Sequence, residues 1–357
     1  MAAGSEPDRP ALPGSGAAVP APLSGVIMKT RLSAASQRSV GAGAAPANML
    51  IHANNPALRC QPSSLCRLIC SGLALFLMAG CSSSTPSVSG PGMAYQNAKD
   101  FFARGHSANY EHALNVLATL SSADPPNDYT NRARVLRAII LCGQFEGYRR
   151  LAEAYQKGAD HASDHAVKSD YTGLYRDTMR RSGEISLGFA EAAMQLTKGG
   201  QVPTGLTLDA SYPETLSSVS TATLDKVEKG IKIEQPEQAE AALGAPGVGI
   251  AKALGEVVGG DQDAVKSKMD AGPVPLDRAK FGLFLANELA NSATLFDKKH
   301  IYDPGKYKQL AGIAQDAGQA TATALKESPN PDVEKDLKTL QNQLKAGLKA
   351  SQAPVNE

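Results

Sequence analysis

The sequence predicts an all-α protein, with antiparallel helical hairpins followed by a C-terminal helical bundle. Apolar side chains recur three and four positions apart over much of residues 93–198 and 273–350, which places them on one face of a helix. Asp303-Pro304 and Asn330-Pro331 each pair a capping residue with a proline, a pattern typical of helix starts. Aromatic residues make up only 5% of the chain, Trp is absent and Ala is abundant, which favours helices packed through small side chains.

Residues 1–58 form a low-complexity leader rich in Ala, Pro, Gly and Ser, with no apolar periodicity. We expect this leader to lie outside the mature protein and outside the fold. A secretion signal normally begins near the N-terminus. We therefore expect translation to start at Met28, at Met49 or at a later non-Met codon.

Residues 59–80 have the three parts of a secretion signal. Arg59 and Arg67 form a basic lead-in, residues 68–78 are apolar and uncharged, and Ala79-Gly80 supplies a small-residue exit. The apolar run is too short to cross a bilayer as a helix, because a span needs about 20 apolar residues. The sequence therefore predicts a signal peptide that ends at residue 80.

The residues Met78-Ala79-Gly80-Cys81 resemble the lipobox of bacterial lipoproteins. The resemblance implies cleavage before Cys81, a diacylglycerol on its thiol, and acylation of the new N-terminus, for example with palmitate. Residues 81–92, rich in Ser, Pro and Gly, look like the tether of such proteins, and this composition argues against a short buried helix ending at Cys81. Ser82 stands where enterobacterial inner-membrane lipoproteins carry Asp, so the resemblance implies anchoring in the outer membrane on its periplasmic side.

Residues 93–198 form the first predicted lobe, which begins with two helical hairpins related by an offset of 35 residues. The motif Tyr110-x-x-Ala113-x-x-x-Leu117 resembles the second helix of a tetratricopeptide repeat, and Gly143-x-Phe145 resembles the turn between its helices. This TPR-like resemblance implies a helical groove for a protein or peptide. The family's Trp, Leu-Gly pair and closing Pro are absent, so generic antiparallel helices remain the alternative.

A long helix is predicted from Val167 to Leu196, where apolar residues again recur at helical spacing. Gly183 and Gly188 are expected to kink or break this helix. The glycine- and proline-containing stretch 198–205 is expected to end it.

Residues 199–272 are predicted to be a mixed helical and loop segment. We expect a loop at 199–212, a helix at 213–226 and a short strand within 227–235. The glycine-rich, apolar stretch 239–260 does not fit a dinucleotide or phosphate fingerprint. It is interpreted as a helix packed closely through small residues, with a mobile apolar contact segment as the alternative.

Residues 273–350 are predicted to form a C-terminal bundle of three antiparallel helices. Pro273-Val-Pro275 introduces the first helix, and the two cap-proline pairs introduce the others. The last helix carries an apolar stripe, with lysines on its solvent-exposed face. Residues after Ala350 are expected to fray.

Net charge argues against a nucleic-acid partner. Six of the 36 basic and two of the 35 acidic residues precede Cys81, which leaves the mature chain with a net charge of −3. Cys60, Cys66 and Cys70 also precede the cleavage site, so Cys142 is the sole unmodified cysteine of the mature chain and no intramolecular disulfide is expected. Its apolar surroundings favour a buried, inert thiol over a reactive one.

The sequence feature that most resembles a metal-binding motif is a pair of histidines four residues apart. His161 and His165, with Asp160 and Asp164 beside them, would share one face of a helix. No third ligand is implied, so a solvated turn between helices is favoured, and no metal or cofactor is expected. His300 is expected at a helix end, where a cation meets the negative pole.

Arginines concentrate in the first lobe, where they are interpreted either as a face for anionic partners or lipid headgroups or as solvated residues paired with acids. They are Arg132, Arg134, Arg137, Arg149, Arg150, Arg176, Arg180 and Arg181.

No nucleophile elbow or zincin motif occurs in the sequence, so we expect a protein that is not an enzyme. The predicted function is that of a membrane-anchored lipoprotein, lipidated at Cys81, acting as a non-catalytic helical scaffold for an envelope protein or peptide. The alternative is a small-ligand-binding accessory component of an envelope transport system, with a pocket lined by Phe, Tyr and Arg. A hydrolase of envelope polymers would need convergent carboxylates, and the sequence identifies no ligand-binding residue.

Overall fold

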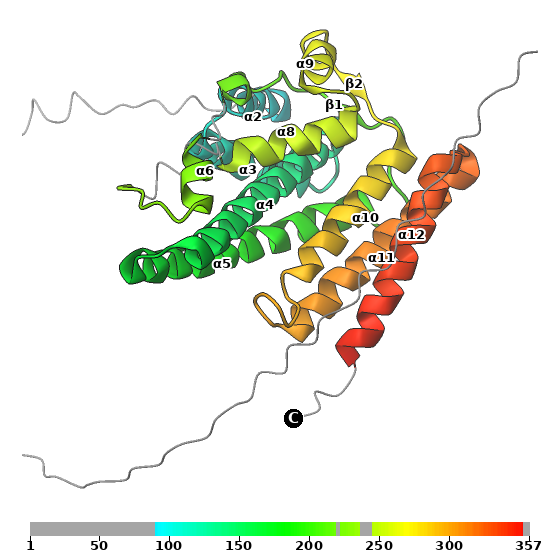
Figure 1. The fold of residues 1–357 in the computed structure, drawn as a ribbon. Coiled ribbons are helices and arrows are strands. Elements are labelled where there is room, and N and C mark those ends of the chain that lie inside the picture. Colours follow the sequence, from blue (N-terminus) through cyan, green and yellow to red (C-terminus); the bar gives the residue numbers. More distant parts are fainter. Residues whose placement is uncertain (1–89, 219–221, 236–244, 353–357) are drawn as a thin grey trace, which may run out of the picture. The chain divides into compact units, whose positions relative to one another are not determined.

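The computed structural model describes residues 90–218, 222–235 and 245–352, which form an all-α fold (Figure 1). The leader, the signal peptide and Cys81 lie outside the described residues, as does the tether up to residue 89. Across the three described ranges, no helix combines the length and apolar character needed to cross a membrane.

The N-terminal lobe consists of two helical hairpins. Helices α2 (Pro91–Arg104) and α3 (Ser107–Ser121) form the first, in which the rings of Phe102 and Tyr110 lie 5.9 Å apart. Helices α4 (Thr130–His161) and α5 (His165–Leu196) form the second and pack along one another. The first predicted hairpin is therefore confirmed.

The predicted turn at Gly143-x-Phe145 is wrong, because α4 continues through it as one helix. Gly143 is a site of close packing, since a Cβ atom there would collide with the side chain and backbone of Ile250. Helix α5 continues without interruption from His165 to Leu196, so the predicted break at Gly183 or Gly188 is absent. Gly183 instead leaves room for two side chains, because a Cβ atom there would lie 3.0 Å from Ile301 and 3.3 Å from Phe296.

The segment 199–272 differs from its prediction in the place of its strand. Strand β1 (Thr207–Leu208) lies in the predicted loop and pairs antiparallel with β2 (Val274–Pro275), in the register Thr207 to Pro275 and Leu208 to Val274. The predicted strand in 227–235 is wrong, because α6 (Ala222–Glu228) covers its start and the rest is irregular. The 3₁₀ helix η1 (Glu214–Ser218) precedes α6.

The described part of the glycine-rich stretch is helix α8 (Ala245–Val258), which is followed by α9 (Gln262–Asp270). Helix α8 packs directly on α4. A Cβ atom on Gly249 would collide with the carbonyl oxygen of Gly143 and lie 2.7 Å from the backbone nitrogen of Gly147. Close packing through small residues is confirmed here, and residues 239–244 lie outside the described residues.

The C-terminal bundle contains the three predicted helices, α10 (Arg278–Thr294), α11 (Pro304–Glu327) and α12 (Pro331–Gln352). Asp303 caps α11 by accepting a hydrogen bond from the Lys306 backbone nitrogen at 3.0 Å, and Asn330 accepts one from Val333 at 3.3 Å. Both predicted caps are confirmed. Asp277 caps α10 in the same way.

Helix α4 lies at the centre of the fold, because it contacts α3, α5, α6 and α8 (Figure 1). Its side chains Leu136, Ile139, Ile140 and Phe145 are fully buried. Asp209 then fixes the segment after β1 to this lobe. Its carboxylate binds Lys99 of α2 at 2.6 Å and Arg132 of α4 at 3.2 Å.

Replacement of Gly249 by Ala should destabilise the protein by about 1–3 kcal/mol, because the added methyl group meets the backbone of α4. The matched control is Gly312→Ala in α11, where a Cβ atom would meet nothing within 4 Å. That change should instead stabilise the protein by up to about 1 kcal/mol. Urea unfolding of both variants measures the difference, and equal effects would contradict the close α4–α8 contact.

Candidate binding site

The histidines and the cysteine singled out in the sequence do not build a site. His161 and His165 are exposed at the α4–α5 turn, where His161 Nδ1 lies 2.7 Å from the Glu228 carbonyl oxygen. Among the residues that the structure describes, no group of three His, Cys, Asp or Glu could hold a metal ion. Cys142 is 1% exposed, and burial raises the pKa of its thiol well above the ordinary value, as expected for an inert thiol.

His300 lies in the turn after α10. Its Nδ1 lies 3.0 Å from the carbonyl oxygen of Thr294, the last residue of that helix, and 2.9 Å from the carboxylate of Asp297. The predicted position at a helix end is confirmed.

The arginines of the first lobe pair mainly with acids and carbonyl oxygens. Arg137 binds Glu191 at 3.1 Å, and Arg181 lies 3.5 Å from Glu111. Both pairs have acidic partners, as that interpretation predicts; Arg181 is solvated, whereas the Arg137 side chain is only 12% exposed. Arg149 belongs to a different set, because its partner Glu146 is buried.

A polar cluster lies where α4, α8 and α10 meet, with Lys252 at its centre. Its Nζ atom lies 3.0 Å from a carboxylate oxygen of Glu146, and 3.6 Å from one of Glu256 and one of Glu288. The side chains of Glu146 and Glu288 are only 7% and 4% exposed. Three carboxylates from three helices therefore converge on a single ammonium group.

The environments of Glu146 and Glu288 move their pKa values in opposite directions. Burial opposes ionisation of Glu146, but hydrogen bonds and charge from Arg149 and Lys252 outweigh it and lower the pKa. Burial and the negative charge of Glu146 raise the pKa of Glu288 to about 7, although Lys252 acts in the opposite sense. Burial also raises the pKa of Glu256, so Glu146 is the carboxyl of the cluster that most readily stays ionised, whereas Glu256 and Glu288 take up protons more easily.

Glu288 is also incompletely bonded. Its Oε1 atom accepts a hydrogen bond from Asn291 at 3.4 Å, but its Oε2 atom is buried without a hydrogen-bond partner. Most buried polar atoms in proteins have such a partner, and a missing one costs about 1–3 kcal/mol. This oxygen therefore needs a donor, which is either a proton shared with the neighbouring Glu256 carboxyl or a cation brought by a ligand.

A hollow of about 590 Å³ opens beside this cluster between α8, α10 and α12, and we call it the acidic hollow. Four acids and two lysines line it, together with four amides and five apolar residues. They are Glu256, Glu288, Asp332, Asp336, Lys252, Lys280, Asn287, Asn291, Asn330, Gln343, Leu283, Phe284, Ala290, Val333 and Leu340. Acids outnumber lysines by two, so the hollow attracts cations.

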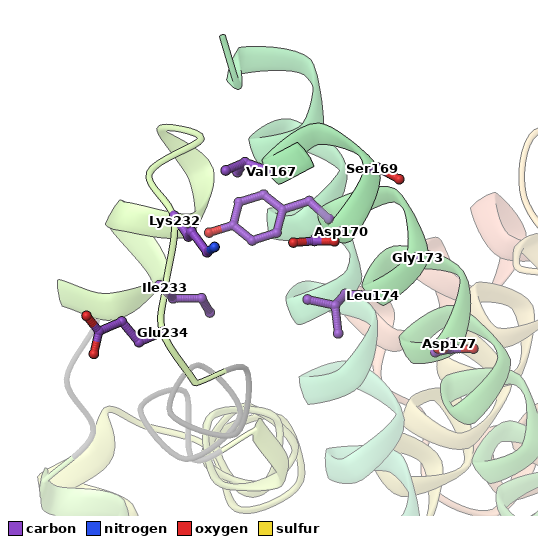
Figure 2. Close-up of a pocket in the computed structure, with 10 residues that line it drawn as sticks. Val167, Ser169, Asp170, Gly173, Leu174, Asp177, Lys232, Ile233 and Glu234 are labelled. Carbon is purple, nitrogen blue, oxygen red and sulfur yellow. The ribbon is translucent and has the colours of Figure 1, made fainter. Parts of the chain in front are cut away.

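A second hollow, of about 470 Å³, lies between α5 and residues 232–234 (Figure 2). Leu174 and Ile233 point toward one another across it, whereas Glu234 points away. The hydroxyl of Tyr171 donates to the Ile231 carbonyl oxygen at 2.5 Å and holds this segment against α5. The charged residues that line this hollow are all exposed, so it lacks the buried, unpartnered group of the acidic hollow.

Sequence reasoning missed the polar cluster because its members lie far apart in the chain and form no motif. One signal was available at Glu288, which falls four residues after Phe284 and three after Leu285, on the apolar face of α10. A carboxylate on such a face is either paired or functional. Glu146 follows the buried Phe145 in the same way, as an acid within an apolar run.

Two of the three convergent carboxylates, Glu256 and Glu288, line the acidic hollow. Glu288 has the pKa of a general acid near neutral pH, but Glu146 is held by Arg149 and Lys252 and is not among the residues that line the acidic hollow. The arrangement is suited to binding a positive charge, because a cation would complete a cluster that has more carboxylates than cations.

Replacement of Glu288 by Gln should stabilise the protein at pH 8 by about 3 kcal/mol, the cost of ionising a buried carboxyl whose pKa is raised from 4.5 to about 7. A raised carboxyl pKa leaves stability intact below the unfolded pKa and reduces it as pH rises toward the folded pKa. The gain should therefore vanish near pH 4.5. Urea unfolding at pH 4.5, 6 and 8 measures it, with the exposed Asp177→Asn as control, and a gain independent of pH would contradict the assignment.

Comparison with known proteins gives no relative for this chain. No protein-family model, no curated protein and no solved structure matches it. The functional proposal therefore depends on the chemistry of the acidic hollow and on the residues around Cys81.

Proposed function

We propose that this protein is a lipoprotein of the bacterial envelope, held in the outer membrane by lipid on Cys81 with its helical body on the periplasmic side. It acts there as a non-catalytic scaffold that binds a segment of another envelope protein or peptide. The observation that carries the binding role is the acidic hollow, with its excess of carboxylates and its apolar wall. The lipobox-like residues before Cys81 support the anchor.

The composition of the hollow favours a peptide segment. Leu283, Phe284 and Val333 are buried apolar residues of its lining, while Asp332 and Asp336 are exposed acids. An apolar wall with charged side chains around it suits a segment that carries both apolar and basic residues. Helix-lined grooves commonly bind segments of this kind.

A small-ligand-binding accessory component of a transport system is the second candidate. The volume of about 590 Å³ favours it, because small-molecule sites typically measure about 300–1,000 Å³. The lining contains Phe284 but neither Tyr nor Arg, and so differs from the pocket expected for this candidate. The peptide-binding scaffold therefore remains the preferred proposal.

The Cys81→Ser variant should lose membrane attachment, because only a thiol can form the thioether that carries the lipid. Intact mass of the protein from its native membrane should show a chain that begins at Cys81 and carries acyl groups. The variant should retain the residues before position 81 and lack those groups. Cys142→Ala is the matched control and should stay lipidated. An unmodified wild-type chain that retains its leader would exclude the anchor.

Neutralising the exposed acids of the hollow should weaken partner binding. We would place a photo-crosslinking residue at Asn287, expose the chain to detergent-solubilised envelope, and identify crosslinked peptides by mass spectrometry. The D332N/D336N variant should reduce the crosslink at least about fivefold, and added salt should reduce it in wild type, because both weaken attraction to a basic segment.

The matched control for this experiment removes the same two charges from the second hollow, as D170N/D177N, and should leave the crosslink unchanged. Equal crosslinking by both double variants would contradict binding in the acidic hollow. A hollow that yields only small-molecule adducts would favour the second candidate.

A further inference from the structure

The polar cluster around Lys252 contains fewer cations than carboxylates. Glu146, Glu256 and Glu288 all lie within 3.6 Å of its Nζ atom. The second cation, Arg149, binds Glu146 at 3.0 Å and Glu153 at 2.8 Å, and so brings a fourth carboxylate into the network. The network therefore contains two cationic side chains and four acidic ones, so positive charges are in the minority.

Glu288 is the carboxyl of the network that is least well paired with a cation. Its residue is 3% exposed, its Oε2 atom has no partner, and its contact with Lys252, at 3.6 Å, is longer than a strong ionic hydrogen bond. Charged groups reach it from each side. Glu146 comes from α4, and Lys252 and Glu256 come from α8. Lys280 of α10 and the acids Asp332 and Asp336 of α12 line the same hollow.

Helices α5 and α11 also pack against α10. The charges that act most strongly on Glu288 are nevertheless those of Glu146, Lys252 and Glu256. Two of these three are negative, so the surroundings of Glu288 favour an added cation.

We propose that the acidic hollow binds the side chain of a lysine or arginine of the partner segment, and that Glu288 receives its positive charge. This inference rests on the proposed function, since it assigns the chemistry of the segment that the scaffold binds. An ammonium or guanidinium group there would supply the missing cation and a hydrogen-bond donor to the carboxylate.

The lining suits both parts of such a side chain. Leu283, Phe284 and Leu340 are buried apolar residues that can contact the methylene stem, while the charged end reaches the carboxyl of Glu288. The hollow, at about 590 Å³, exceeds the volume of one side chain, so flanking residues of the segment also enter it. Asp332 and Asp336 would attract further basic residues of that segment.

Binding of this kind requires Glu288 to be ionised, so it is linked to release of a proton to solvent. Because the pKa of Glu288 is about 7, the ionised fraction falls about tenfold from pH 8 to pH 6. The apparent affinity should fall by the same factor, since only the ionised form is competent to bind. The competing explanation is a proton shared between Glu288 and Glu256, which would complete the cluster without a ligand.

Isothermal titration of the full chain with capped pentapeptides tests the inference. The probes are Ser-Leu-Lys-Leu-Ser, its arginine analogue and its glutamine analogue, with n-butylammonium chloride as a small cation. The lysine and arginine peptides should bind at least about tenfold more tightly than the glutamine peptide, and about tenfold more tightly at pH 8 than at pH 6. Titrations at pH 6 in buffers of different ionisation enthalpy should show proton release.

Glu288→Gln should weaken binding of the lysine peptide at least about tenfold and abolish its pH dependence. The variant is expected to be more stable at pH 8, so loss of binding there would not reflect unfolding. Asp336→Asn is the matched control. It removes one exposed acid from the same hollow and should preserve the pH dependence.

Equal binding by wild type and Glu288→Gln, or equal binding of the lysine and glutamine peptides, would overturn the inference while leaving a peptide-binding scaffold intact. Binding independent of pH would overturn it in favour of the shared proton. If n-butylammonium binds in a Glu288-dependent way but no peptide binds, the cation chemistry of Glu288 stands and the peptide-binding function fails. If no probe binds at all, the assignment of Glu288 as a cation receptor fails.

Discussion

The close contact between Gly143 of α4 and Gly249 of α8 is the constraint on which the candidate binding site depends. Neither residue has a Cβ atom, so the two helix backbones approach one another more closely than larger residues would allow. Three residues further along each helix, Lys252 then reaches Glu146 at 3.0 Å. The close approach of the two backbones therefore fixes where Glu146 and Lys252 lie relative to one another.

The buried charges of this cluster destabilise the free protein, as expected where a binding partner supplies the missing charge. A buried carboxylate without a full set of partners destabilises a fold, and Glu288 lies on a face of α10 where an apolar residue would pack well. Proteins often retain such local conflicts at functional sites. A partner that brings a cation would relieve this conflict, so the same residue that weakens the free protein would strengthen the complex.

The parts of the fold that could be predicted are those encoded by neighbouring residues. Asp303 and Asn330 cap their helices through backbone groups three residues away, so their sequences alone identify the helix starts. The turn predicted at Gly143 is wrong because glycine is common both in turns and at close helix crossings, and only the neighbouring helix distinguishes the two. The two-residue strand at Thr207–Leu208 is too short to show any periodicity.

The sequence by itself determined the all-α fold class, the bundle of three C-terminal helices and the buried state of Cys142, because apolar spacing and capping are local properties of the chain. The lipobox-like residues before Cys81 likewise predict the anchor from four consecutive positions. Only the tertiary structure decided where Glu146, Lys252 and Glu288 meet. Their electrostatic balance depends on distances between side chains that are more than 30 residues apart in the chain, and no local pattern specifies those distances.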